Sequence, residues 1–123
     1  MPRRCPESVA TAPRSLLLRV QTAGSPAYSR AAELATEAAR LAREILGPTI
    51  EVIWFGSWPR GRAHERSDVD IAIRCPAGAP RDRLRRVREA IDELPTLYSI
   101  DVLDLRDASP VLAEEVERYG RPI

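Results

Sequence analysis

The chain has 123 residues, 44% of them hydrophobic, and a formal net charge of +1. This length fits one domain with a modest core, and the balanced charge argues against direct nucleic-acid binding driven by a global basic field. Its apolar runs are too short for a membrane span or a signal-peptide core, so we expect a cytoplasmic protein with no membrane contact. The two cysteines, Cys5 and Cys75, lie far apart and predict reduced thiols.

The N-terminal segment differs in composition from the rest of the chain. Residues 1–25 contain four arginines, one acid and scattered prolines, with no sustained hydrophobic period. This composition predicts a mostly disordered arm. We therefore place the folded domain at residues 26–123.

From Ser25 onward the sequence alternates between helical and strand patterns. Ser25-Pro26 is a helix start and Gly47-Pro48 a stop, and an apolar stripe lies between them at helical spacing: Leu34, Ala38, Leu41, Ala42 and Ile45. The later patterns predict strands over 50–55, 68–74 and 97–105, and helices over 81–94 and from Ser109-Pro110 to Tyr119. Because no crossover helix separates the first two strands, we expect them to be antiparallel, in a small, mixed, mainly antiparallel sheet of an α+β domain.

Three carboxylates interrupt these predicted strands. Asp68 and Asp70 alternate with Val69 and Ile71, so they should project from one face, and Asp101 interrupts the apolar run of the third strand. If the second and third strands are neighbours, the three acids converge and raise one another's pKa unless a cation lies between them. Oxygen ligands favour Mg²⁺, and a pair of such ions is typical of phosphoryl and nucleotidyl transfer.

The stretch between the first two strands carries groups suited to phosphate. Gly56 follows directly on the apolar run ending at Phe55, where a tight turn or a close approach to a ligand favours glycine. Ser57 offers a hydroxyl and a backbone N–H, which we expect at the start of a short helical turn. Three arginines follow that are candidates for contact with a polyphosphate: Arg60, Arg62 and Arg66.

Gly56-Ser57, ten further residues and then Asp68-Val69-Asp70 resemble the defining motif of the DNA polymerase β-type nucleotidyltransferase superfamily. The short chain, Arg60-Gly61 and the ending "EEVERYGRPI" resemble its minimal branch, the MNT antitoxins paired with HEPN toxins. The resemblance covers about residues 28 to 123, and the chain departs from it at Trp58-Pro59.

This resemblance implies a polymerase β-like nucleotidyltransferase fold and a reaction. It places two Mg²⁺ ions on Asp68, Asp70 and Asp101, with Asp101 also able to assist deprotonation of the acceptor. It places the terminal phosphates of ATP on Gly56 and Ser57, and we add Arg62 as a nucleotide-binding candidate. It further implies transfer of AMP to a hydroxyl of a protein acceptor, a tyrosine of a HEPN-type toxin, so that the chain acts as an antitoxin.

Two other functions are consistent with the sequence. The domain could mask a HEPN-type partner by binding alone, although a pure binder has no physical need for three clustered acids. Transfer to a small molecule is a further alternative, but relatives with that activity usually carry a second domain.

Several nearby residues have simpler structural interpretations. We expect core packing for Trp54, and leave core packing and base stacking both open for Trp58. We expect a solvent-facing loop position for His64 and loop or capping roles for Asp104 and Asp107.

Overall fold

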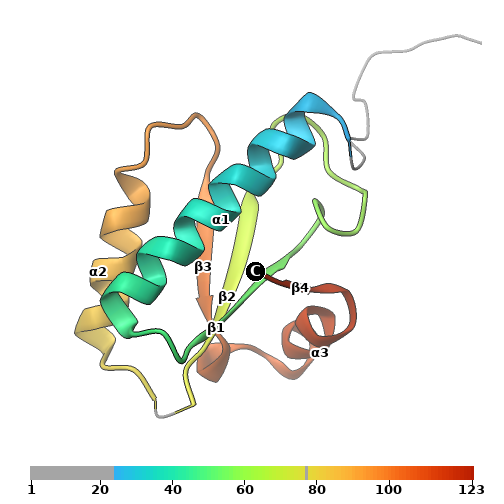
Figure 1. Cartoon of the computed structure of the whole chain (residues 1–123). Helices are drawn as coiled ribbons and strands as arrows, with labels where there is room; N and C mark the ends of the chain where they lie inside the picture. The colour runs from blue at the N-terminus through green and yellow to red at the C-terminus, as the bar shows by residue number, and fades with distance from the viewer. Residues whose placement is uncertain (1–23, 77) are drawn as a thin grey trace, which may run out of the picture.

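The computed structural model describes residues 24–76 and 78–123 (Figure 1). The predicted arm at 1–25 thus lies, apart from its last two residues, outside the described part. Three α-helices, one 3₁₀ helix and four strands follow one another as α1 (Pro26–Leu46), β1 (Glu51–Phe55), β2 (Val69–Arg74), α2 (Arg81–Asp92), β3 (Ile100–Asp104), η1 (Leu105–Asp107), α3 (Pro110–Tyr119) and β4 (Arg121–Pro122).

The ends of α1 follow from its flanking residues. The Ser25 hydroxyl accepts a hydrogen bond from the backbone N–H of Tyr28, Pro26 occupies the first turn, and Gly47 ends the helix at φ 106°. The buried face consists of alanines, namely Ala31, Ala35, Ala38, Ala39 and Ala42. This differs from the predicted stripe, because Leu34 is half-buried and lies outside the main core, while Leu41 and Ile45 pack at its margin.

The four strands form one mixed sheet in the order β3-β2-β1-β4. As predicted, β1 and β2 are antiparallel, and β4 also pairs antiparallel with β1. The second pair of predicted neighbours, β2 and β3, runs parallel. The sequence analysis missed β4, because two residues are too few to show an alternating pattern.

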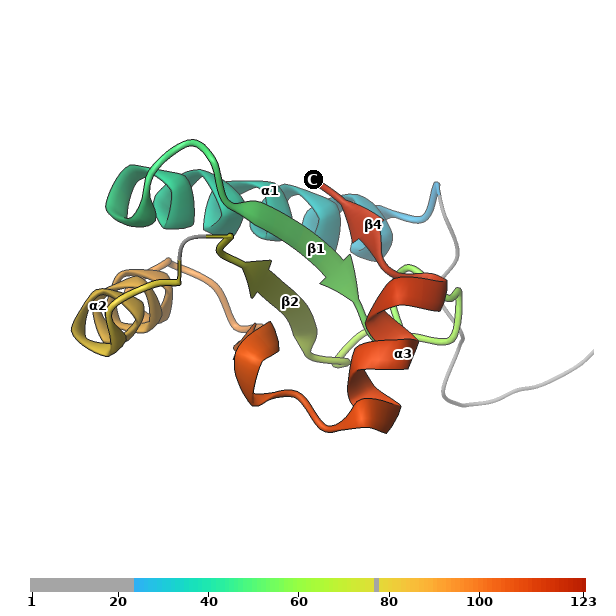
Figure 2. The ribbon, with the colours of Figure 1, turned by 90° about the horizontal axis from the view of Figure 1, so that it is seen from below.

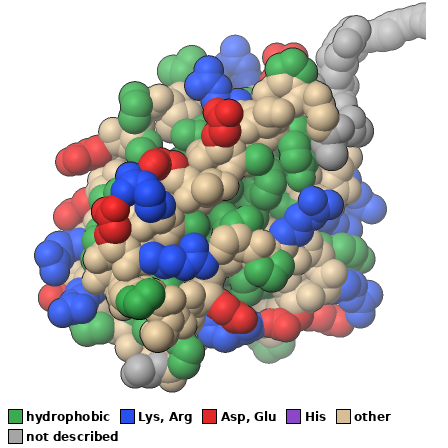
Figure 3. Space-filling model, viewed as in Figure 1, with side chains coloured by type: hydrophobic (Ala, Val, Ile, Leu, Met, Phe, Trp, Pro, Cys, Tyr) green, Lys and Arg blue, Asp and Glu red, His purple; other side chains and the backbone are tan. Residues whose placement is uncertain are grey.

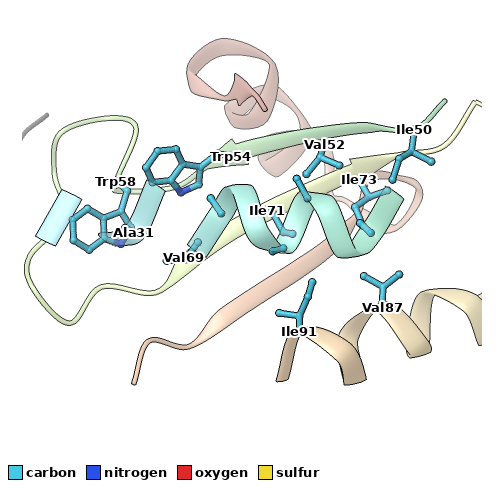
Figure 4. Packing of buried hydrophobic residues seen from close by; sticks show 14 of the residues in the cluster. Ala31, Ile50, Val52, Trp54, Trp58, Val69, Ile71, Ile73, Val87 and Ile91 are labelled. Carbon is cyan, nitrogen blue, oxygen red and sulfur yellow. The ribbon is translucent and has the colours of Figure 1, made fainter. Parts of the chain in front are cut away.

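The main hydrophobic core lies between the sheet and the helices α1 and α2. Val69, Ile71 and Ile73 point to this side from β2, as their alternation predicted, and Val52 and Trp54 join them from β1 (Figure 4). Leu84, Val87 and Ile91 complete the core from α2. The helix predicted over residues 81–94 is therefore confirmed, and it ends two residues earlier, at Asp92.

The opposite face of the sheet is only partly covered. Seen from below, α1 lies on one side of the sheet and α3 on the other, beside β1 and β4 (Figure 2). A second, smaller cluster forms there from Ile53, Phe55, Ala72 and Val116. Because α3 lies toward β1, the part of this face that carries the acids of β2 and β3 borders a cleft.

The surface on the α1 side has mixed character. Arginines and acidic side chains are interspersed over the face that Figure 3 shows, so this face carries no continuous basic patch. None of the helices in the described residues is long and apolar enough to cross a membrane.

Candidate active site

The turn after β1 comes into close contact with β2. Gly56 has φ 86°, and a Cβ atom there would lie 2.3 Å from Oδ2 of Asp70. Both the positive φ and the lack of space require glycine. The first half of the predicted motif is thus in contact with the second half.

The segment after Gly56 is a hydrogen-bonded turn and not a regular helix. The N–H of Gly61 donates to Trp58 O at 3.1 Å, and that of Arg62 to Ser57 O at 2.9 Å. Trp58 anchors this turn from beneath, since its side chain is fully buried and its Nε1 donates to Ser67 O at 3.1 Å. Core packing is therefore the role of Trp58, as it is of Trp54. The half-buried Ser57 stands at the start of the turn.

Asp70 and Asp101 come together through the parallel pairing of β2 and β3. The two residues are direct partners in the register of this pair. Both line a cleft of about 670 Å³, together with Phe55 and Gly56. Leu112 and Glu115 of α3 form one wall, and Arg88 and Asp92 of α2 form another.

The crowding of these acids raises the pKa of Asp70. Burial makes the largest contribution, followed by the negative charges of Asp101 and Asp68, and together they raise the pKa to about 7. Glu115 adds a smaller contribution of the same sign. A cation in the cleft would relieve this repulsion and favour the charged carboxylates.

Asp68 lies beside this pair. It immediately precedes β2, is exposed, and lines a neighbouring cavity of about 710 Å³ with Arg66, Leu97 and Tyr98 among others. In residues 24–76 and 78–123, no three His, Cys, Asp or Glu side chains are gathered closely enough to hold a metal ion. The predicted trio is thus a pair, Asp70 and Asp101, with Asp68 next to it.

The donor chemistry nevertheless fits a hard divalent cation. The titratable side chains lining the cleft are the carboxylates Asp70, Asp92, Asp101 and Glu115, together with Arg88. Oxygen-only ligands of this kind suit Mg²⁺, and the negative charges of Asp101 and Asp68 add to burial in raising the pKa of Asp70. Within the cleft, Asp70 and Asp101 are the residues that could hold such an ion, with Asp68 beside them.

The basic candidates of the sequence lie in different places. Arg60 lies over the ring of Tyr119, with its Cζ 4.0 Å from the ring centroid. Arg62 has an exposed side chain, and Arg66 lines the cavity beside Asp68. His64 is half-buried in the loop, where its Nδ1 accepts from the Arg66 N–H at 3.4 Å.

Asp104 and Asp107 have structural roles, as predicted. Asp104 caps η1, accepting from the Arg106 N–H at 3.0 Å, and also binds the Arg106 side chain. Asp107 accepts from Arg81 at 2.6 Å. Neither residue lines the cleft.

Three residues of the cleft were not identified from the sequence: Arg88, Asp92 and Glu115. Charged residues on amphipathic helices ordinarily face solvent, and only the packing of α2 and α3 against the sheet brings these three to the acids. A weak signal existed for Glu115, which lies three residues after Leu112 and next to the buried Val116.

The glycine turn after β1 and the paired acids of β2 and β3 lie within the part of the chain that a family model matches. The chain belongs to the family described as "Polymerase beta, Nucleotidyltransferase", whose model matches residues 43–123. The fold class expected from the sequence is thereby confirmed.

Three known proteins are similar to this chain. It is 36% identical over 78 residues to the protein adenylyltransferase MntA of Shewanella oneidensis, an alignment covering 62% of this chain and 55% of that protein. The chain thus spans about half the length of this curated relative. A solved toxin–antitoxin structure with AMP-PNP matches with a TM-score of 0.53 and 27% identity over 72% of this chain and 70% of that chain. A solved minimal nucleotidyltransferase matches in fold with a TM-score of 0.60 and 24% identity, covering 82% of this chain and 99% of that chain.

Proposed function

We propose that this protein is a Mg²⁺-dependent protein adenylyltransferase that transfers AMP from ATP to a hydroxyl of a protein acceptor. The observation that carries the proposal is the pairing of Asp70 with Asp101 beside Gly56 in one cleft. The adenylyltransferase activity named for the Shewanella relative and the AMP-PNP in the toxin–antitoxin structure support it.

The proposed reaction is an in-line displacement at the α-phosphorus of ATP. The acceptor hydroxyl oxygen forms a new bond to this phosphorus, the bond to the β-phosphate oxygen breaks, and pyrophosphate leaves. Asp101 takes the hydroxyl proton. Two Mg²⁺ ions, when bound, would be held by Asp68, Asp70 and Asp101 and would neutralise the charge of the phosphates.

The remaining motif residues position the nucleotide. Ser57 and the backbone after Gly56 would hold the terminal phosphates. Because Gly56 has no Cβ, this turn can lie directly against Asp70. Arg62 has an exposed side chain in the same turn and would pair with the polyphosphate.

For the acceptor, we propose a tyrosine of a HEPN-type toxin, which makes this protein its antitoxin. This acceptor is supported by the Gly-Ser and Asp-Val-Asp motif, by the residues "EEVERYGRPI" and by the similarity to a toxin–antitoxin structure. Silencing then follows from the covalent modification of the toxin and not from masking alone.

The decisive experiment is the intact mass of the adjacent gene's product after incubation with this protein, ATP and Mg²⁺. Wild type and Asp82→Asn, which removes an exposed carboxylate of α2 outside the cleft, should add one or more AMP units. Asp70→Asn should add none. Persistent transfer by Asp70→Asn would refute the assignment.

The same experiment tests the alternative of masking. A stable complex without any mass gain would make the protein a binding module. The double variant Asp68→Asn/Asp70→Asn then gives the second measurement, since full silencing of the partner by this variant would mean that binding suffices.

A further inference from the structure

The three acids of α3 have different surroundings. Glu114 accepts from Arg118 at 3.0 Å, and Glu117 pairs with Arg74. Glu115 has no arginine partner among the residues that the structure describes, and it lines the cleft that holds Asp70 and Asp101. It is therefore the acid of this helix whose charge is directed to the candidate active site.

The packing of α3 keeps Glu115 at this wall. Leu112, one turn earlier, lines the same cleft and packs against the second hydrophobic cluster. Val116, the next residue, is 1% exposed. At the end of the helix, a Cβ on Gly120 would lie 2.4 Å from Cγ2 of Ile53, so the helix meets β1 without spare room.

The half-buried position makes the charge of Glu115 effective across the cleft. Solvent screens partly buried charges less than exposed ones. The opposite wall carries one cation, Arg88, which donates to Val102 O at 3.3 Å, and one further acid, Asp92. The charges facing the Asp70–Asp101 pair from the two helices are thus predominantly negative.

We propose that Glu115 is an outer carboxylate of the divalent-cation site, which strengthens cation binding at Asp70 and Asp101 through its charge and not as a ligand. The proposal rests on the cation requirement of the proposed function. No residue of α3 was assigned to the site by the motif.

Binding of Mn²⁺ to the full chain, measured from the electron paramagnetic resonance signal of the free ion, tests the proposal without an acceptor or turnover. Glu115→Gln removes the charge and keeps the side-chain shape, and we expect Mn²⁺ affinity to fall about tenfold, as for other outer partners of metal sites. Glu114→Gln is the matched control on the same helix, and its affinity should stay within about twofold, because this acid is exposed and already paired. Asp70→Asn should abolish specific binding.

Two results would overturn the proposal. Unchanged Mn²⁺ affinity in Glu115→Gln, with binding still lost in Asp70→Asn, would remove Glu115 from the site and leave the proposed function intact. An affinity loss in Glu115→Asp as large as that in Glu115→Gln would make Glu115 a direct ligand, because the shorter side chain keeps the charge but moves the carboxylate out of coordination distance. If Asp70→Asn binds Mn²⁺ as wild type does, the cation site of the proposed function itself is refuted.

Discussion

At the scale of single residues, the close approach of Gly56 to Asp70 connects the fold to the chemistry. The turn after β1 passes so near the second motif aspartate that any side chain at position 56 would displace the Asp70 carboxylate. Gly61, five residues later, also has a positive φ, of 70°, but a Cβ there meets no atom within 4 Å. A comparison of substitutions at these two glycines therefore distinguishes the effect of backbone strain from the effect of contact with Asp70.

We predict that Gly56→Ala lowers the free energy of unfolding by about 1–3 kcal/mol and abolishes AMP transfer, because it adds strain and displaces Asp70. Gly61→Ala should cost only about 1 kcal/mol and retain most of the activity. Urea unfolding and the intact-mass assay measure both effects. Equal losses of activity in the two variants would contradict the importance of the Asp70 contact.

Asp104 gives a second prediction at this scale, for stability against pH. This carboxylate is 4% exposed. Burial raises its pKa, but hydrogen bonds from the Arg106 side chain and backbone N–H and the charges of Arg106 and Arg81 outweigh burial, so the net pKa lies below its usual 3.8. A pKa lowered by folding stabilises the protein above the unfolded-state value, and this stabilisation is lost as the pH falls through the lower folded-state pKa.

We expect Asp104→Asn to lower the free energy of unfolding at pH 7 by about 1–3 kcal/mol, since buried charge-assisted hydrogen bonds to Arg106 are lost. Below about pH 4 the difference between variant and wild type should begin to shrink, and it should vanish only below the lowered folded-state pKa of Asp104, where protonation removes the charge from the folded wild type. Urea unfolding at several pH values measures this. Asp107→Asn is the exposed control and should change the free energy of unfolding by less than about 1 kcal/mol. If the difference between wild type and Asp104→Asn persisted undiminished at low pH, the stabilisation would not come from the charge of Asp104.

At the scale of elements, the position of α3 decides how open the active-site face is. This helix packs against β1 through Val116 and leaves the acids of β2 and β3 in contact with the cleft. Its remaining apolar residues are less buried, and Val111 is 79% exposed. The attachment of α3 to the sheet therefore depends on few side chains.

We predict that Val116→Ala lowers the free energy of unfolding by about 2 kcal/mol, because it removes buried methyl groups and leaves a cavity against β1. The same substitution at Val111 is the matched control and should change it by less than about 0.5 kcal/mol. Chemical unfolding of both variants is the measurement. Equal effects at the two positions would contradict the packing of α3 described above.

At the scale of the whole molecule, the site is assembled from five separate parts of the chain. The turn after β1, the neighbouring strands β2 and β3, and the helices α2 and α3 all line one cleft. A ligand in that cleft contacts elements far apart in sequence, so its binding should stabilise the entire domain.

We therefore expect MgATP at about 100 times its Kd to add about 2.7 kcal/mol to the free energy of unfolding and to raise the Tm on the order of 10 °C. Removing the divalent ion with EDTA should cancel most of this shift, because the paired carboxylates then repel the phosphates. Thermal unfolding of wild type and Asp70→Asn measures it. A full shift in Asp70→Asn would place the nucleotide outside this cleft.

Much of the fold follows from short-range physics and was predictable. Ser25-Pro26 and Gly47 define α1 through capping and backbone preference, and the alternation around Asp70 assigned the two faces of β2 correctly. The spacing from Gly56 to Asp68 and Asp70 indicated the family, and in the structure the hairpin of β1 and β2 brings the glycine turn against Asp70.

The sequence by itself determined the elements, the fold class and the motif, since capping, alternation and turn chemistry depend on residues that are close in the chain. Only the tertiary structure decided that Asp101 pairs with Asp70, that Trp58 is buried beneath the turn, that Arg60 lies on Tyr119 and that Glu115 faces the acids. These contacts join residues from different elements. Their formation depends on strand register and helix packing, which arise when the whole core is assembled and leave no local pattern in the sequence.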